Sequence, residues 1–367
     1  MLKYWLGFNQ VPGIGAKRLR ALLDTCGSIE AAWHASEAQL IEAGLDRRSL
    51  QSLIHARQTL DLDQEVQRLH QTQIRTLTWE DAAYPARLQQ LDAPPPVLFL
   101  RGELLPEDDW AVAVVGTRRA TIYGREVAHR LTVTLAGAGV TVVSGLARGI
   151  DAVAHRAAME AGGRTLAVLG NGLDSVYPPE HRDLARQIAG QGALISEHPP
   201  GVAPESRNFP ARNRIISGLS LGVVVVEGRW TSGAVITAKQ ALEQGREVFA
   251  VPGSILAPSS EGPNRLIKEG ATPVLDANDV LEALNLTQVA QQLDARHVLP
   301  EDPTEMRLLD FLSREPRHVD EIRRQADLPV NEITSALAMM ELKGMVRQVG
   351  GMNYVLAREP GPIYRIS

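Results

Sequence analysis

Between residues 106 and 287 the sequence alternates short, continuously apolar runs with longer stretches of helical composition. Six such runs are present: Ala111–Val115, Val140–Val143, Leu166–Leu169, Ala193–Ile195, Leu221–Val226 and Val248–Val251. Strands that are apolar at every position are buried on both faces, which requires helices on both sides of a parallel sheet. The alternation therefore predicts an α/β core with a doubly wound parallel sheet.

Most of the expected strands end in a turn that contains glycine or another small residue. These turns are Gly116-Thr117, Ser144-Gly145, Gly170-Asn171-Gly172, Glu227-Gly228 and Pro252-Gly253. Glycine lets the backbone turn tightly and come close to a ligand. Because doubly wound sheets bind ligands at the carboxyl ends of their strands, we expect the binding site at this edge.

Four strings near these turns carry residue types that suit phosphate groups. The candidates are Gly116, Thr117, Arg118, Arg119, Ser144, Gly145, Arg148, Asn208, Phe209, Arg212, Asn213, Arg214, Ser232, Gly233 and Lys239. Backbone N–H groups, hydroxyl groups and guanidinium forks all bind phosphate oxygens. An aromatic ring beside arginines is the usual platform for single-stranded nucleic acid, so Phe209 is expected to stack on a base.

The charge distribution leaves room for an anionic ligand. The whole chain has a net charge of −5, which by itself argues against nucleic acid as a partner. Residues 111–270, however, contain 17 Lys and Arg against 13 Asp and Glu, a net charge of +4. Phosphates respond to the local field, so the basic middle of this acidic chain remains a candidate for binding nucleic acid.

An all-helical domain is predicted over 1–65, where apolar residues recur at helical spacing between glycine-containing breaks. Its string VPGIGAKR has the composition of a helix-hairpin-helix turn. N–H groups at a helix N-terminus bind phosphate, which makes Gly13, Gly15 and Lys17 candidate DNA contacts. The alternative is a turn that serves only packing, which the many acidic residues of this segment favour.

The remaining segments are predicted to connect the core and to form a third domain. Residues 66–105 are expected to be a connecting segment, and the polar residues 288–302 a linker. The order helix, helix, helix, hairpin over 303–358 is that of a winged-helix domain. Its third helix, Val330–Lys343, has a single basic residue, so a protein–protein or autoinhibitory role is favoured over contact with duplex DNA.

Taken together, these strings resemble those of the DprA (Smf) family of DNA-processing proteins. The resemblance covers nearly the whole chain and rests on VVGTRRATIYG, VSGLARGIDAVAH, LGNGLDSVYPPEHR, ISEHPPG, NFPARNRIISGLS, TSGAVITA and VFAVPG. The sequence departs from the usual family pattern at Ala234-Val235 and at Ser206-Arg207.

The resemblance implies an extended Rossmann-like core between an N-terminal helix-hairpin-helix (SAM-like) domain and a C-terminal winged-helix domain. It also implies a protein that binds and protects incoming single-stranded DNA and forms homodimers, or higher assemblies on DNA. A member of this family is expected to load RecA onto that DNA in natural transformation and recombination.

The sequence predicts a binding protein rather than an enzyme, with no cofactor and no metal. Neither a Walker A string nor a GxGxxG motif follows the first strand, and the single Cys26 excludes a Cys-based zinc finger. The alternative is an enzyme resembling the nucleoside-monophosphate phosphoribohydrolases, but the double-glycine loop of that family is absent from Glu227–Gly233. Of the two candidate bases, His155 is expected to pack on its helix and His181 to be solvated.

No membrane partner is expected. No apolar run approaches the roughly 20 residues that span a bilayer. No basic-then-apolar signal stretch opens the chain, because Met1–Phe8 leads directly into Pro12-Gly13. A cytoplasmic protein is therefore expected.

Overall fold

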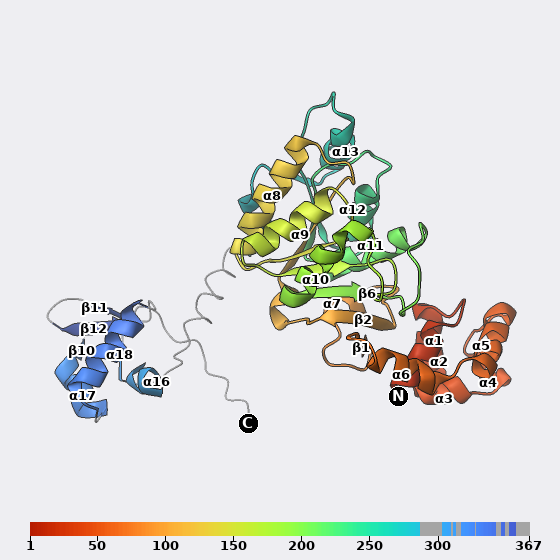
Figure 1. Cartoon of the computed structure of the whole chain (residues 1–367), viewed down its shortest axis with the longest axis horizontal. Helices are drawn as coiled ribbons and strands as arrows, with labels where there is room; N and C mark the ends of the chain where they lie inside the picture. Colours follow the sequence, from red (N-terminus) through yellow and green to blue (C-terminus); the bar gives the residue numbers. More distant parts are fainter. Residues whose placement is uncertain are drawn as a thin grey trace. The chain divides into compact units, whose positions relative to one another are not determined.

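The computed structural model describes residues 1–286, 303–309, 311–312, 317–326, 328–342, 346–348 and 352–356. They belong to two compact units, Met1–Val289 and Ala290–Ser367, drawn in Figure 1. The predicted fold class is confirmed, since a mainly parallel α/β core follows an all-helical segment and precedes a winged helix. The predicted linker, 288–302, lies outside the described residues.

A nine-stranded sheet forms the centre of the first unit, in the order β1-β2-β6-β5-β4-β3-β7-β8-β9. Its parallel strands are β3 (Ala111–Val115), β4 (Thr141–Ser144), β5 (Thr165–Val168), β6 (Ala193–Ser196), β7 (Gly222–Val225), β8 (Glu247–Ala250) and β9 (Thr272–Pro273). The chain builds β4 to β6 on one side of β3 and β7 to β9 on the other. The strand order therefore reverses between β3 and β7, which makes this the topological switch point of the sheet.

Helices cover both faces of the sheet (Figure 1). One face carries α8 (Ile122–Gly137), α9 (Ile150–Glu160) and α10 (Arg182–Gln191), with α14 (Ala277–Ala283) packed on α8. The other face carries α11 (Asn208–Leu219), α12 (Gly233–Glu243) and α13 (Glu261–Lys268). Alternate residues of β5 reach opposite cores, Ala167 on the α10 side and Leu166 and Val168 on the α11 side. This two-sided burial explains why the strands are apolar at every position.

Residues 66–105, expected to be a connecting segment, instead extend the sheet. β1 (Arg75–Thr78) pairs antiparallel with β2 (Val97–Gly102), which pairs antiparallel with β6, and the short helix α7 (Ala86–Gln89) lies between them. The prediction was wrong because prolines interrupt the local pattern of this segment. The pairing of β2 with β6 joins residues almost a hundred positions apart, for example Leu100 and Ile195, and local periodicity carries no record of it.

Six helices precede the sheet: α1 (Leu2–Asn9), α2 (Ala16–Cys26), α3 (Ile29–His34), α4 (Glu37–Glu42), α5 (Arg47–Thr59) and α6 (Leu62–His70). They share one continuous hydrophobic core with the α10 side of the sheet. The Trp5 and Trp79 rings meet edge to face with centroids 5.6 Å apart, and Asn9 Nδ2 donates to the Glu197 carbonyl at 3.4 Å. The predicted helical segment is therefore part of the same compact unit as the sheet.

The second unit contains α16 (Pro303–Leu309), α17 (Val319–Ala326) and α18 (Val330–Leu342) with a three-stranded sheet. Its strands are β10 (Arg317–His318), β11 (Val346–Gln348) and β12 (Asn353–Leu356), in the order β10-β12-β11. Ile322, Ile333 and Leu337 are fully buried in its core. Lys343, the one basic residue of the predicted third helix, lies outside the described residues. Within the described part of the chain, no helix is long and apolar enough to cross a bilayer.

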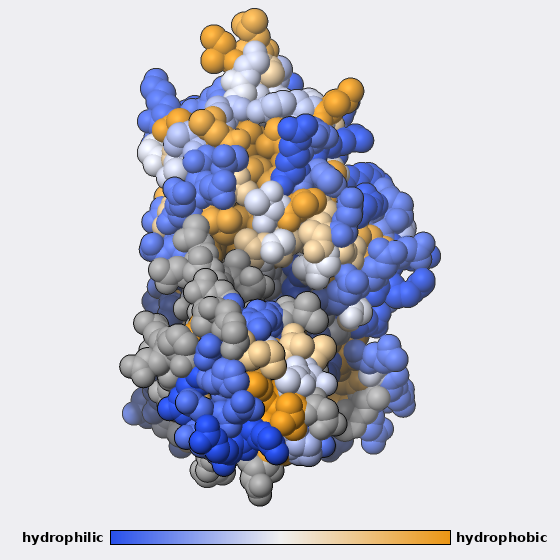
Figure 2. Space-filling view, turned by 90° about the vertical axis from the view of Figure 1, so that its left-hand side faces the viewer, coloured by the Kyte–Doolittle hydropathy of each residue, from blue (hydrophilic) through white to orange (hydrophobic). Residues whose placement is uncertain are grey.

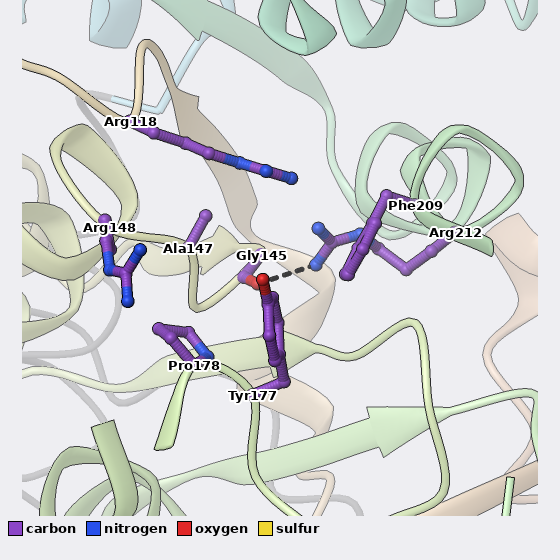
Figure 3. A pocket seen from close by; sticks show the side chains of 8 residues that line it. All are labelled: Arg118, Gly145, Ala147, Arg148, Tyr177, Pro178, Phe209 and Arg212. Atoms are coloured by element: carbon purple, nitrogen blue, oxygen red, sulfur yellow. Dashed lines mark hydrogen bonds between the residues drawn. The ribbon is translucent and has the colours of Figure 1, made fainter. Parts of the chain in front are cut away.

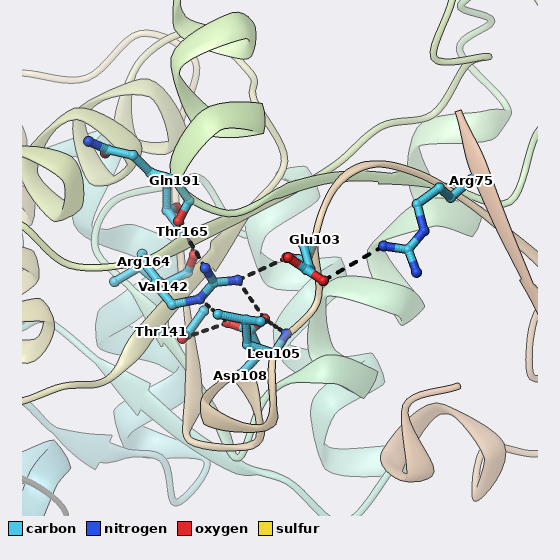
Figure 4. A network of polar contacts seen from close by, with 9 residues as sticks. All are labelled: Arg75, Glu103, Leu105, Asp108, Thr141, Val142, Arg164, Thr165 and Gln191. Atoms are coloured by element: carbon cyan, nitrogen blue, oxygen red, sulfur yellow. Dashed lines mark hydrogen bonds and ion pairs between the residues drawn. The ribbon is translucent and has the colours of Figure 1, made fainter. Parts of the chain in front are cut away.

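A buried polar network joins the segment after β2 to the amino ends of β4 and β5 (Figure 4). Its centre is Asp108, the third residue of a 3₁₀ helix, η1 (Pro106–Asp109). Arg164 donates to both carboxylate oxygens of Asp108 at 2.9 Å, and Thr141 Oγ1 and Leu105 N donate at 2.9 and 2.8 Å. Arg164 also donates to the Glu103 carbonyl at 2.9 Å. A single carboxylate thus holds three parts of the chain together.

We expect the substitution Asp108→Ala to lower the free energy of unfolding by about 3–5 kcal/mol, because it leaves a largely buried guanidinium without its partner. Urea denaturation measures this loss. The matched control is Asp109→Ala, since the Asp109 side chain is 70% exposed and its pair with Arg87 lies at the surface. That control should cost less than about 1 kcal/mol, and equal losses in both variants would contradict the role of Asp108.

Candidate nucleic-acid interface

A cleft opens at the carboxyl ends of β3 and β4, beside the first turns of α11 and α12. Its cavity volume is about 510 Å³, which is within the range of sites that hold small ligands. A smaller pocket that adjoins it, shown in Figure 3, is lined by Arg118, Gly145, Ala147, Arg148, Tyr177, Pro178, Phe209 and Arg212. The cleft coincides with the switch point between β3 and β7, where ligands of doubly wound sheets bind.

Arg212 lies in the floor of the cleft rather than on its surface. The residue is only 4% exposed, and its Nη1 donates to the Gly145 carbonyl at 2.7 Å and to the Val168 carbonyl. Burial lowers the pKa of Arg212 to about 10, so the side chain stays protonated at neutral pH. A cation is thus fixed beneath the cleft by carbonyl groups at the ends of β4 and β5.

The turn after β4 uses its N–H groups within the protein. Asp151 Oδ2 accepts from the N–H groups of Gly145 at 3.1 Å and Ala147 at 3.3 Å. Burial raises the pKa of the Asp151 carboxyl, and the charge of Arg212 acts in the opposite direction. Gly145 therefore contributes no free amide to a phosphate, and its role is steric, because a Cβ there would lie 2.4 Å from Arg212 Nη1.

Two buried histidines hold the same turn. Leu146, in a left-handed conformation with φ of 57°, donates its N–H to His155 Nε2 at 3.3 Å, and its carbonyl lies 2.9 Å from His181 Nδ1. His155 Nδ1 lies 2.7 Å from Thr165 Oγ1. Burial lowers the pKa of His155 to about 3, which keeps the ring neutral. The expectation that His181 is solvated was wrong, because its side chain is buried and its Nδ1 pairs with the Leu146 carbonyl.

Glu227, which follows β7, holds the loop after β3. Its carbonyl accepts from Thr117 N at 2.7 Å, and its carboxylate accepts from Thr121 N at 3.0 Å and Thr121 Oγ1 at 2.6 Å. Glu227 is 1% exposed. Glu227 therefore holds both ends of the loop 117–121 across the switch point, and two of the three intervening residues, Arg118 and Arg119, line the cleft.

The exposed Arg118 lies beside two aromatic rings of the cleft, those of Tyr177 and of the half-buried Phe209. Arg118 Cζ lies 5.3 Å from the centroid of the Phe209 ring, and the Tyr177 and Phe209 centroids are 5.7 Å apart at an angle of 36°. Figure 3 shows Arg118 reaching across the pocket from the loop after β3. Rings beside a guanidinium offer faces to bases and charge to phosphates. The sequence reasoning missed Tyr177, although it quoted the string LGNGLDSVYPPEHR that contains it.

The structure brings together residues from all four predicted strings. The predicted residues that line the cleft are Gly116, Thr117, Arg118, Arg119, Gly145, Arg148, Phe209, Arg212, Asn213, Ser232 and Gly233. Arg148, at the rim, forms an ion pair with Glu180, whereas Arg118 and Arg119 are exposed. The four strings come together because the sheet is parallel, which places the turns after β3, β4 and β7 at the same edge.

The other four predicted residues do not line the cleft: Ser144, Asn208, Arg214 and Lys239. Ser144 is fully buried, and its Oγ donates to the Val114 carbonyl at 2.7 Å. Arg214 forms an ion pair with Glu197, with both side chains mostly buried. Lys239 lies over the Trp230 ring at 4.5 Å from its centroid. Each of these side chains except that of Asn208 thus has a partner within the protein that accounts for it.

The hairpin between α1 and α2 is fastened to α5. Gly13 adopts a φ of 87°, and its carbonyl accepts from Arg18, which also donates to Ser49 Oγ at 2.8 Å and pairs with Asp46 at 2.6 Å. This arrangement provides the packing role that the sequence left as an alternative. Lys17 and Gly15 are exposed, and contact of Gly13, Gly15 and Lys17 with DNA stays a prediction.

The cleft offers little for metal chemistry. Among the described residues, no three His, Cys, Asp or Glu side chains are arranged to hold a metal ion. The two carboxylates beside the cleft, Asp151 and Glu227, both accept backbone N–H groups of the surrounding loops. In this structure both carboxylates therefore stabilise the loops around the cleft.

The fold and the cleft define an α/β protein with a basic, aromatic binding cleft at the switch point of its sheet. The model of the DNA recombination-mediator protein A family matches residues 75–285, and the model of the DprA winged helix domain matches residues 292–352. This chain belongs to the DNA recombination-mediator protein A family, as its motifs predicted.

Similar proteins cover most of the chain. Protein Smf from Synechocystis is 36% identical over 388 residues, which cover 96% of this chain and 98% of that protein. The X-ray structure of DNA processing protein A from Streptococcus pneumoniae has a TM-score of 0.69 at 34% identity and covers 77% of this chain and 98% of its own. A structure of DNA processing protein A from Helicobacter pylori, which concerns its single-stranded DNA binding mode, has a TM-score of 0.53 at 29% identity, covering 58% and 95%.

We expect the free energy of unfolding to decrease as the pH is lowered, because of His155. The unfolded chain protonates this residue near its ordinary pKa of 6.5, whereas the folded chain keeps it neutral down to about 3. The unfolded state therefore binds more protons below pH 6.5, and the free energy of unfolding should fall by up to about 1.4 kcal/mol per pH unit. Urea denaturation between pH 7 and pH 5 measures this slope.

The substitution His155→Gln should flatten that slope, because it removes the titrating group. The control is His129→Gln, since the His129 side chain is 43% exposed and pairs with Glu160 at the surface. Equal slopes for the wild type and His155→Gln would show that the buried ring does not govern the acid sensitivity.

Proposed function

We propose that this protein binds single-stranded DNA in the cleft, protects it, and loads RecA onto it in natural transformation and recombination. The observation that carries the proposal is the contact of Arg118 with the Phe209 ring, beside Tyr177 and above the buried cation of Arg212. The Helicobacter pylori relative, studied for its single-stranded DNA binding mode, supports the same ligand. We infer a binding protein rather than an enzyme, since the neighbouring carboxylates brace loops.

Single strands suit this cleft better than duplex. Phe209 is half-buried in the lining, so a base must present its open face to reach the ring. Bases in a duplex are stacked on both faces, whereas those of a single strand can rotate onto a protein ring. Stacking on an aromatic ring tolerates every base, which suits a protein that handles DNA of any sequence.

The RecA partner and the cytoplasmic setting follow from family membership. Loading a recombinase requires that single-stranded DNA be held without being cut, which agrees with a site made of rings and arginines. The winged helix offers a second interaction surface. Its third helix begins with Glu332 as the acidic residue of its first turn, which favours a protein partner over the phosphates of duplex DNA.

We further propose that the chain forms a homodimer through the β9 end of its sheet. Ile255, Leu256 and Leu275 are 90%, 88% and 82% exposed there, next to the edge strand β9. Figure 2 shows hydrophobic side chains at the top of the view, the end of the core where α13 lies in Figure 1. Exposed apolar residues beside an open strand edge are typical of a protein interface.

The substitution Arg118→Ala should weaken binding of single-stranded DNA and reduce its salt dependence. One lost phosphate contact lowers the slope of log affinity against log salt by about 0.7 for a single strand. Fluorescence anisotropy of a labelled oligonucleotide over a series of salt concentrations measures the slope. The matched control is Arg214→Ala, because the Arg214 guanidinium pairs with Glu197 and does not line the cleft.

Phe209→Ala separates stacking from charge in the same assay. It should cost about 1–3 kcal/mol of binding free energy while the salt slope stays unchanged. If Arg118→Ala and Arg214→Ala change the slope equally, the cleft is not the DNA site.

The substitution of Leu256 and Leu275 by Asp should convert a dimer into a monomer, because it places charges in an apolar interface. Sedimentation velocity or light scattering of the purified chain measures the mass. Ile41→Asp is the control, since Ile41 is 58% exposed on α4, far along the chain from this patch. A mass that is unchanged in the double variant would exclude this interface.

A further inference from the structure

A second groove runs along α10, with a cavity volume of about 710 Å³. It lies between α10, the end of β2 and the residue before β1, and its lining includes Gln73, Arg101, Ser175, Val176, Arg182 and Arg186. No aromatic ring belongs to its lining. The groove is therefore a basic channel without a stacking platform, unlike the cleft.

The charge of this groove is poorly neutralised by the protein itself. Among the described residues, neither Arg101 nor Arg182 forms an ion pair, and the Nε atom of Arg101 is buried without a hydrogen-bond partner. Arg186 pairs with Asp183 at the surface. The one carboxylate in the lining, Asp174, accepts from Gly201 N at 2.9 Å. A guanidinium that is partly removed from water without a partner favours an external anion.

The groove and the cleft share one loop. Residues 174–176 of the segment after β5 line the groove, and the next two residues, Tyr177 and Pro178, line the pocket that adjoins the cleft. A DNA strand that leaves the cleft across this loop therefore reaches Arg182, the first residue of α10. α10 spans ten residues, or about 15 Å of helix, which accommodates a few nucleotides.

We propose that the α10 groove binds the sugar-phosphate backbone of single-stranded DNA as the strand leaves the cleft. This inference rests on the proposed function of the cleft and extends its footprint. Arginine side chains without rings bind phosphates rather than bases, so the groove adds affinity and direction without adding sequence preference. The cleft holds a base, and the groove holds the backbone next to it.

The test compares a short oligonucleotide, which fills only the cleft, with a longer one that reaches the groove. Wild-type protein should bind the longer oligonucleotide more tightly. The Arg101→Ala and Arg182→Ala double variant should keep its affinity for the short one and bind the longer one about tenfold more weakly. On the longer strand its salt slope should fall by about 0.7 for each lost phosphate contact.

Arg156→Ala is the matched control, because it removes an exposed positive charge of α9 that lines neither site. Arg182→Ala alone repeats the test on an exposed residue, in case the loss of the half-buried Arg101 disturbs folding. Loss of the same size on both oligonucleotides, or in the Arg156 variant, would overturn the groove proposal, as would a wild type that gains nothing with length. If instead the proposed function of the cleft is wrong, wild-type protein will not bind the short oligonucleotide, which distinguishes that outcome from failure of the groove proposal.

Discussion

The site depends on the buried guanidinium of Arg212. A cation this far from water must have partners, and it finds them in the carbonyl groups of Gly145 and Val168. These carbonyls belong to the ends of neighbouring strands, so Arg212 joins α11 to β4 and β5. The same interaction forbids a side chain at residue 145. The hydrogen bonds of Arg212 therefore do two things at once: they hold α11 against the sheet and they place a positive charge under the cleft.

The loops above this floor are held by the protein rather than left for the ligand. Asp151 and the two histidines engage the turn after β4, and Glu227 engages the loop after β3. The glycine-rich turns thus bring strand ends close together, and most of the backbone N–H groups described above donate to acceptors within the protein. What remains for a ligand is carried by side chains, above all Arg118, Phe209 and Tyr177. A site of this kind favours stacking and charge over recognition of one phosphate by a ring of amides.

The sequence predicted the six central strands to within one residue, because uninterrupted apolar runs allow few alternatives. It also predicted the edge of the sheet at which the cleft lies, since that follows from parallel topology. It could not assign Arg212 and Arg214 their different roles. Both lie on α11, and only the rotation of that helix decides that one enters the floor and the other meets Glu197, 17 residues earlier. For the same reason the pairing of β2 with β6, which joins distant parts of the chain, could not be predicted.

The rigidity of the cleft bears on how a flexible ligand can bind. Single-stranded DNA loses conformational freedom on binding, and a protein that also had to order its loops would lose more. Here Glu227 and Asp151 already hold the loops through hydrogen bonds, so for the proposed ligand the cost would fall mainly on the DNA. The net charge of −5 acts in the same direction, because the acidic flanks disfavour loose contacts outside the basic core. The proposed site, where the Phe209 ring lies beside Arg118, therefore stands out within an acidic chain.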